Sequence, residues 1–500
     1  MNINSGKHLN QISGAPRKTY LTTKTLWIAS LLTLCLVGGL AIAFVQPLII
    51  IGAIGGIIGA MSLIFHPFLG VLGYITFEYG NMAKMIPALG AIHSGKIIIV
   101  LTLLIWVIRS KMKGQINFVS DKLNWVMYIW LITAIISTQA AMDLDKSIQG
   151  VIDLLKWLII YIMIINIVDD QPKWRMSMWL LLLLNFKMSQ HQIRAYGAGL
   201  AASGSFQSHF IREGMGSGSS SFFGNAGDFG VAMCVVVPLA FYLMKAEKNT
   251  ILKIIGLIFT IFFTVSLVKS GARGSIVGFA VIALIFWLKS SYKLPTAVSI
   301  ILLAATYWVS APDVVKNRFI AATEEEKDNT SAHRLLLWKT GINMFLDHPL
   351  TGIGINNFHE SAGRYYLHGE DRAGALEPHN IFIKAISELG LVGITCVLSA
   401  IFLIFLRNRQ IRKLLIKHNM KNDFIYNFSH GLDLALVGYI TSGSFITVLY
   451  YPHLFIIMAF TASLYNITAK RIEQKLDLIE PENKNINTSA KFALSTNSKP

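Results

Sequence analysis

The chain has 500 residues, of which 53% are hydrophobic and only 14% are charged. Soluble globular proteins carry about 25% charged residues, so the deficit excludes a water-soluble fold of this length. The formal net charge of +17 would suit nucleic acid in a soluble protein. Here the basic clusters lie between apolar stretches, as the positive-inside bias of membrane proteins predicts. We therefore expect membrane lipid around the chain and no nucleic-acid partner.

The apolar residues form blocks of the length that crosses a bilayer, which takes about 20 residues. Some of these blocks are short, so the sequence predicts an all-α, polytopic transmembrane helix bundle of roughly 12 to 14 spans. In chain order, the predicted spans are 25–44, 48–65, 67–80, 96–109, 123–140, 148–168, 174–187, 223–244, 251–270, 272–289, 293–310, 380–405, 430–449 and 452–468.

Basic residues between the spans predict which side of the membrane each loop occupies. The segment Arg407 to Lys421 is rich in Arg and Lys and has no acidic residue, which predicts a cytoplasmic position. The same reasoning makes residues 1–24 a cytoplasmic N-terminal segment, before a membrane domain at 25–468. It also makes residues 469–500 a cytoplasmic tail, which we expect to be disordered because it is polar.

Two long connections then fall on the outer, periplasmic face, at 188–222 and 311–378. The second is predicted to be partly helical. It repeats apolar residues at helical spacing, with Ser331 as a possible N-cap, which predicts an amphipathic helix at the membrane surface. The repeated residues are Leu335, Trp338, Ile342 and Phe345.

The break at Asp347-His348-Pro349 is predicted to end that helix, and Gly352-Ile353-Gly354 then predicts a tight turn. No strand and helix surround these glycines, so the Gly-x-Gly pattern is a weak signal for a nucleotide site.

His379 lies in Pro378-His379-Asn380, directly before an apolar helix and at the outer membrane boundary. The positive end of a helix dipole disfavours imidazolium, so the ring should stay neutral. A neutral histidine can take a proton from a hydroxyl group, which is general-base chemistry. The alternative is that His379 only caps the helix or bonds a loop.

Arg273 is the second candidate, in the small-residue run from Ser270 to Ser275 near the same boundary. A guanidinium in this position is costly unless it meets an anion or water. Small neighbours would let a phosphate approach, and the planar fork of donors on Arg suits phosphate. The alternative is ordinary snorkelling of an interfacial Arg.

Further arginines near outer boundaries are each more often solvated loop charges; they are Arg194, Arg212, Arg334 and Arg364. Asp153 and Lys156 lie three residues apart on one helix face, where they are expected to neutralise each other. The sequence has no His, Cys and carboxylate cluster with metal-ligand spacing and no Walker loop. We therefore expect no metal and no cofactor.

Several motifs together resemble the O-antigen ligase family, over roughly Ser205 to Ser399. His379-Asn380, a gap of nine residues and Gly390-x-x-Gly393 match the family's outer-loop pattern. The run from Arg334 through Trp338 to Phe358 resembles the preceding part of that loop. Ser270 to Gly274 resembles the family's Ser-Arg-Gly segment, and Phe223 to Leu239 is a looser match because Ala226 and Gly227 replace Pro-Asn.

This resemblance implies a transferase of the bacterial inner membrane that acts at the periplasmic face. It would move a glycan from an undecaprenyl diphosphate carrier to an acceptor hydroxyl, such as one on lipid A–core. In that reading Arg273 and Arg212 bind the diphosphate, and His379 is the general base. Arg334 and Asn380 position the acceptor and the loop, and no metal is required.

Other functions within the same superfamily are an O-antigen polymerase and a protein O-oligosaccharyltransferase. A transporter is the alternative outside it, since some relatives were described as inorganic-carbon transporters. A transporter predicts ionisable residues near the bilayer midplane and an internal repeat. Here the conspicuous ionisable groups gather at one interface beside a long outer loop, which favours an interfacial enzyme.

Overall fold

The structure is a computed structural model that describes residues 61–80, 94–112, 118–203, 225–310, 329–365, 377–421 and 423–496, with a few single residues between them. The chain divides into two compact units, Met1–Phe65 and His66–Pro500. Almost all of the first unit lies outside the described residues, and with it the predicted spans 25–44 and 48–65. The helices α3 to α20 all belong to the second unit.

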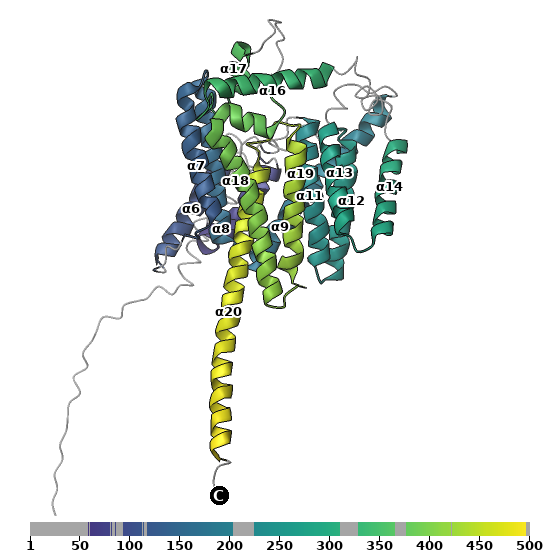
Figure 1. The fold of residues 1–500 in the computed structure, drawn as a ribbon. Coiled ribbons are helices and arrows are strands. Elements are labelled where there is room, and N and C mark those ends of the chain that lie inside the picture. The colour runs from purple at the N-terminus through teal and green to yellow at the C-terminus, as the bar shows by residue number, and fades with distance from the viewer. Residues whose placement is uncertain are drawn as a thin grey trace, which may run out of the picture. The chain divides into compact units, whose positions relative to one another are not determined.

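The second unit is built from helices, and its described residues contain no strand (Figure 1). This confirms the predicted all-α bundle. The helices are α3 (Pro67–Gly80), α6 (Ser94–Met112), α7 (Lys122–Ser137), the short 3-10 turn η1 (Thr138–Ala140), α8 (Leu144–Ile167), α9 (Gln171–Ser203), α11 (Ala226–Ala246), α12 (Thr250–Lys269), α13 (Arg273–Lys289), α14 (Lys293–Ser310), α16 (Asn329–Asp347), α17 (Phe358–Tyr365), α18 (Ile381–Lys417), α19 (Phe424–Gly443) and α20 (Pro452–Thr496).

Within the described part of the chain, 6 helices are long and apolar enough to cross a membrane. They are α7 with η1, α8, α11, α12, α18 and the first part of α20. A helix satisfies its own backbone hydrogen bonds, which is the condition for crossing a bilayer. The chain is therefore a multi-pass membrane protein.

Every predicted span from 67–80 onward falls on a helix, but several helices have clearly different bounds. Helix α9 runs to Ser203, so residues 188–203, which were predicted to be loop, are helical. Helix α19 ends at Gly443, and residues 444–451 form a loop, of which residues 444–449 were predicted to belong to the span 430–449. That loop is apolar and partly buried, so hydropathy alone could not separate it from a span.

The basic segment that predicted a cytoplasmic turn is mostly the end of α18, which continues to Lys417. Arg407 and Arg412 turn inward and pair with acids of other helices. Their guanidinium nitrogens lie 3.0 Å from Asp121 Oδ2 and 2.8 Å from Asp433 Oδ2. These two cations therefore join helices, whereas the sequence had counted them only as charges of a loop.

The last helix, α20, continues to Thr496, whereas residues 469–500 were predicted to be a disordered tail. Its residues 469–476 are mostly good helix formers such as Ala, Lys, Glu, Gln and Leu, which extend the helix beyond the apolar part. Side-chain polarity was therefore a poor guide to where the helix ends.

Helix α16 crosses the same end of the bundle at which α18 begins (Figure 1). The predicted helix and its end at Asp347 are confirmed, but the predicted N-cap is wrong. The helix begins at Asn329, which places Ser331 inside its first turn.

The buried face of α16 also differs from the predicted one. Leu335 and Ile342 are 56% and 46% exposed, whereas Leu337 and Met344 are buried. The reason is Gly341, because a Cβ there would lie 2.6 Å from Ile383 Cγ2 of α18. The missing side chain lets α18 pack against the face that carries Gly341.

Candidate active site

The first candidate residue, His379, stands immediately before α18. Asn380 is the N-cap of that helix, and its side chain accepts hydrogen bonds from the backbone N–H groups of Phe382 (2.8 Å) and Ile383 (3.2 Å). Capping therefore falls to Asn380, so of the two alternative roles of His379 only hydrogen bonding to a loop remains. His379 has φ 47°, a left-handed conformation that non-glycine residues rarely adopt and that is typical of functional sites.

Two hydrogen bonds from distant elements hold the backbone around His379. Trp338 Nε1 of α16 donates to the carbonyl oxygen of Pro378 over 2.9 Å. The His379 N–H donates to Thr447 Oγ1 over 3.1 Å. His379 is thus fixed between α16 on one side and the loop 444–451 on the other.

Arg334 lies one turn before Trp338 in α16, so the structure brings it to the same place as His379. Burial lowers the pKa of His379 below its ordinary value of 6.5, and the nearby Arg334 cation lowers it further. The Glu377 carboxylate opposes both effects, while His333 and Lys384 add smaller decreases of that pKa. The imidazole is therefore neutral at pH 7 and can accept a proton.

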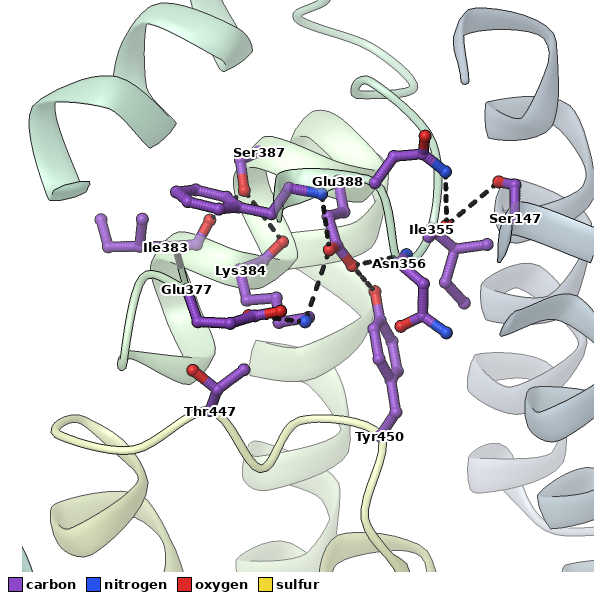
Figure 2. A network of polar contacts seen from close by, with 12 residues as sticks. Ser147, Ile355, Asn356, Glu377, Ile383, Lys384, Ser387, Glu388, Thr447 and Tyr450 are labelled. Atoms are coloured by element: carbon purple, nitrogen blue, oxygen red, sulfur yellow. Dashed lines mark hydrogen bonds and ion pairs between the residues drawn. The ribbon is translucent and has the colours of Figure 1, made fainter. Parts of the chain in front are cut away.

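Glu388, further along α18, carries a fully buried carboxylate (Figure 2). Glu388 Oε2 accepts hydrogen bonds from the Asn356 N–H over 3.0 Å and from the Tyr450 hydroxyl over 2.8 Å. Its Oε1 accepts one from the Phe358 N–H over 3.2 Å. One side chain thus ties α18 to the outer-loop turn and to the loop 444–451.

Lys384 compensates this buried charge from one turn earlier in the helix. Its Nζ lies 3.5 Å from Glu388 Oε1 and 2.9 Å from Glu377 Oε2. Figure 2 draws the three side chains together. A buried charge that loses its partner destabilises a protein by about 3–5 kcal/mol. Glu377 therefore connects the carboxylate network with the charges around His379.

Two glycines let the outer-loop turn approach α18 at backbone distance. Gly390 has φ 63° and interrupts the helix, and a Cβ there would lie 2.5 Å from the Leu350 carbonyl. Gly352 has φ 71°, and a Cβ there would lie 2.3 Å from the Glu388 carbonyl carbon. The predicted tight turn at Gly352 and Gly354 is confirmed.

The interruption of α18 also leaves backbone groups that the turn satisfies. The N–H groups of Ile353 and Gly354 donate to the carbonyls of Ser387 (3.0 Å) and Glu388 (3.1 Å), and the Leu391 N–H donates to the Pro349 carbonyl (2.8 Å). Buried backbone groups need such partners. The spacing of the Gly pattern thus follows from a backbone-to-backbone contact, which the sequence could not reveal.

Arg273, the second candidate, is the first residue of α13, after a turn in which Gly271 has φ 64°. The next residue, Gly274, packs on the loop 444–451, since a Cβ there would lie 2.6 Å from Phe445 Cβ. Thr447 in the same loop accepts the hydrogen bond from His379. The loop 444–451 therefore contacts both His379 and the residue that follows Arg273.

That loop has a further contact with the start of α11. Tyr451 donates to Asp228 Oδ2 over 3.0 Å, and Asn225 caps α11. Arg212, the predicted second ligand of the diphosphate, lies outside the described residues. Of the predicted site residues, His379, Asn380 and Arg334 are thus brought together, whereas Arg273 is linked to them only by the packing of its neighbour Gly274 on the loop.

Sequence reasoning missed Thr447, Tyr450, Glu388 and Lys384. Thr447 lies in a part of the loop that was predicted to be a span, and Tyr450 lies in the short gap between two predicted spans. The second two lie inside an apolar helix, where the spacing of Lys384 and Glu388 was the available signal, because residues four apart meet on one helix face.

Comparison with known proteins bears on this region. Residues 258–398 match the family model described as O-antigen ligase, whereas no curated protein matches the chain. The matched segment contains Arg273, Arg334, His379 and Asn380, and it begins after the looser resemblance at Phe223 to Leu239. Residues 258–398 are therefore similar to the O-antigen ligase family, and this similarity supports a membrane glycosyltransferase of the ligase or polymerase type.

Proposed function

We propose that the chain transfers a glycan from an undecaprenyl diphosphate carrier to an acceptor hydroxyl of lipid A–core, at the periplasmic face of the bacterial inner membrane. The observation that carries this proposal is the setting of His379: a half-buried, neutral imidazole beside Arg334, inside the segment that matches the ligase family. The proposal needs neither a metal nor a cofactor. Both termini are then cytoplasmic.

Arg273 is proposed to bind the diphosphate of the donor. It stands at the N-terminus of α13, where backbone N–H groups and the helix dipole also favour an anion. A cation that is already in place stabilises the charge that develops on the leaving diphosphate. Arg212 is proposed as a second ligand, and the described structure leaves that role open to experiment.

His379 is proposed to accept the proton of the acceptor hydroxyl. As that proton leaves, the acceptor oxygen bonds to the anomeric carbon of the glycan, and the bond from that carbon to the diphosphate oxygen breaks. Undecaprenyl diphosphate departs with the bonding electrons, and the proton remains on His379. A single displacement of this kind inverts the configuration at the anomeric carbon.

The test is transfer by the purified full-length protein in nanodiscs, with lipid-linked glycan as donor and lipid A–core as acceptor. Arg273→Ala should lower the rate roughly 10²–10³-fold, the usual effect of removing one transition-state donor. His379→Gln should lower it roughly 10²–10⁴-fold, as expected for a general base.

Two matched variants serve as controls because they lie in the same outer region. Arg364→Ala and His359→Gln change exposed residues of α17 and should transfer glycan at the wild-type rate. Full transfer by Arg273→Ala would remove the diphosphate role. Full transfer by His379→Gln would reduce His379 to a structural residue of the loop.

A further inference from the structure

A polar cavity of about 330 Å³ lies beside the candidate active site. Its wall combines Glu78 of α3, Asp153 and Lys156 of α8, Asn356 after the outer-loop turn, and Thr447 and Tyr450 of the loop 444–451. The volume falls in the range of small-ligand sites, roughly 300–1,000 Å³. The function proposed above assigns no role to Glu78, Asp153 or Asn356.

Contacts connect this cavity directly to His379. Thr447, which accepts the hydrogen bond from the His379 N–H, is part of its wall. Lys384 is another part of the wall, and its charge acts on His379. A molecule in the cavity therefore lies next to the proposed general base.

The cavity and Arg273 belong to different helices, since α8 lines the cavity and Arg273 begins α13. Helix α13 packs on α19, while α8 packs on α20 and α7. A diphosphate at Arg273 and a second substrate in the cavity would thus be held by different helices, which leaves room for both substrates to bind at the same time.

Two groups of the wall retain hydrogen-bonding capacity. Within the described part of the chain, the Asp153 carboxylate has only a loose ion pair, with Lys156 Nζ at 3.9 Å, and that pair is longer than a hydrogen bond. Among the same described residues, the Asn356 side chain makes no hydrogen bond, and Glu388 accepts one only from its backbone N–H. A carboxylate on a membrane-spanning helix is energetically costly, and such residues are rare outside functional sites.

The backbone is arranged to keep Asn356 in the wall. Asn356 has φ 58°, a left-handed conformation that Asn tolerates better than most residues. Gly150 of α8 makes room for it, because a Cβ there would lie 2.9 Å from Asn356 Nδ2. The turn and α8 are therefore shaped to present this amide to the cavity.

The chemistry of the wall favours a hydroxyl-rich ligand. Carboxylates accept hydrogen bonds from hydroxyl groups, whereas amides and Lys both donate to them. The carboxylates of Glu78 and Asp153 offset the cations of Lys156 and Lys384, so the wall has no excess of positive charge to select a phosphate, and its polar lining would disfavour an alkyl chain. A sugar ring, which donates and accepts at every hydroxyl, satisfies all of these groups.

We infer that this cavity binds the sugar of the acceptor that carries the attacking hydroxyl, with Asp153 and Asn356 as its hydrogen-bonding partners. This inference rests on the proposed function and adds the acceptor subsite to it. Asp153 and Asn356 are binding residues for the acceptor, and the donor does not need them.

The test is binding, measured without turnover on the full-length protein in nanodiscs. The probes are lipid A–core purified from cells that lack this gene, and undecaprenyl diphosphate without a glycan. The variants are Asp153→Asn, which keeps the shape, and Asn356→Gly, which keeps the left-handed backbone. The control is Asp145→Asn, the same change at an exposed position of α8 outside the cavity.

Both cavity variants should weaken the Kd for lipid A–core by about tenfold or more, the size of one lost hydrogen bond to a charged or buried group. The control should keep the wild-type Kd, and undecaprenyl diphosphate should bind all proteins equally. If the wild type binds lipid A–core in this way but transfers no glycan, the proposed function fails while the subsite stands. Any of three results would overturn the inference. They are a wild-type protein that does not bind lipid A–core, cavity variants with an unchanged Kd for lipid A–core, and cavity variants that bind undecaprenyl diphosphate more weakly instead.

Discussion

At the scale of single residues, the site depends on charges that set the protonation of His379. Burial and Arg334 lower the pKa of His379, and Glu377 opposes them. A low pKa keeps the imidazole in its basic form down to mildly acidic pH. The transfer rate should therefore rise with pH through the pKa of His379 and be constant around neutrality.

Neighbouring charges should shift the acidic limb of the pH–rate profile, the range in which the rate rises with pH. Positive and negative neighbours should shift it in opposite directions. Arg334→Ala removes a cation that disfavours imidazolium, so the pKa of His379 rises and the limb moves to higher pH. Glu377→Gln removes an anion that favours imidazolium, so the pKa falls and the limb moves to lower pH. The measurement is kcat/KM for transfer as a function of pH.

Both shifts are independent of how much overall rate each variant loses. His359→Gln, at an exposed histidine of α17, should leave the limb in place. A limb that moves in neither variant would mean that a group other than His379 accepts the proton.

Sequence could identify His379, Asn380, Arg273 and Arg334 because each belongs to a local pattern. Thr447 could not be identified, since its role comes from a hydrogen bond to a residue 68 positions away in the chain. The same holds for Glu388, whose partners Asn356 and Tyr450 meet it only after folding. Local motifs indicated the chemistry, whereas the residues that hold those motifs in place required the fold.

At the scale of elements, the interruption of α18 positions the outer-loop turn. Gly390→Ala puts a side chain into a left-handed position and against the Leu350 backbone. It should destabilise the protein by about 1–3 kcal/mol, seen as a lower midpoint of thermal unfolding in detergent. The matched change Gly363→Ala lies in α17 with open space around it and should be neutral or slightly stabilising. Equal midpoints for the two variants would contradict this account of the interruption.

The loop 444–451 should position His379 through Thr447. Thr447→Val removes the hydrogen-bond acceptor of the His379 N–H and keeps the shape of the side chain. It should lower kcat about three- to tenfold, as expected for one hydrogen bond, with little change in the donor KM. Thr447→Ser should restore the rate, because its hydroxyl can accept the same bond.

Thr441→Val is the control for this prediction, because the Thr441 hydroxyl bonds only to carbonyls within α19. It should transfer at the wild-type rate. If Thr447→Val does so as well, the loop contributes no positioning of His379.

At the scale of the whole molecule, hydropathy was enough for the fold class and for most helices. Hydropathy gave wrong helix bounds or loop positions where apolar or charged side chains lie inside the protein and do not face lipid or water. The loop 444–451 is apolar because it is partly buried between helices, and Arg407 and Arg412 are charged because they pair with Asp121 and Asp433 inside the bundle. Burial within the protein and burial in lipid have the same signature in a sequence, and the structure separates them.

The most direct test of the central claim compares surface glycolipids and the lipid-linked pool in cells with and without this gene. A ligase predicts bare lipid A–core, with long polymer accumulating on the carrier, when the gene is deleted. The wild-type gene should reverse this pattern, and His379→Gln should not. Core that carries a single repeat unit would indicate a polymerase with the same chemistry. Unchanged lipid A–core and an unchanged carrier pool would contradict the proposed function.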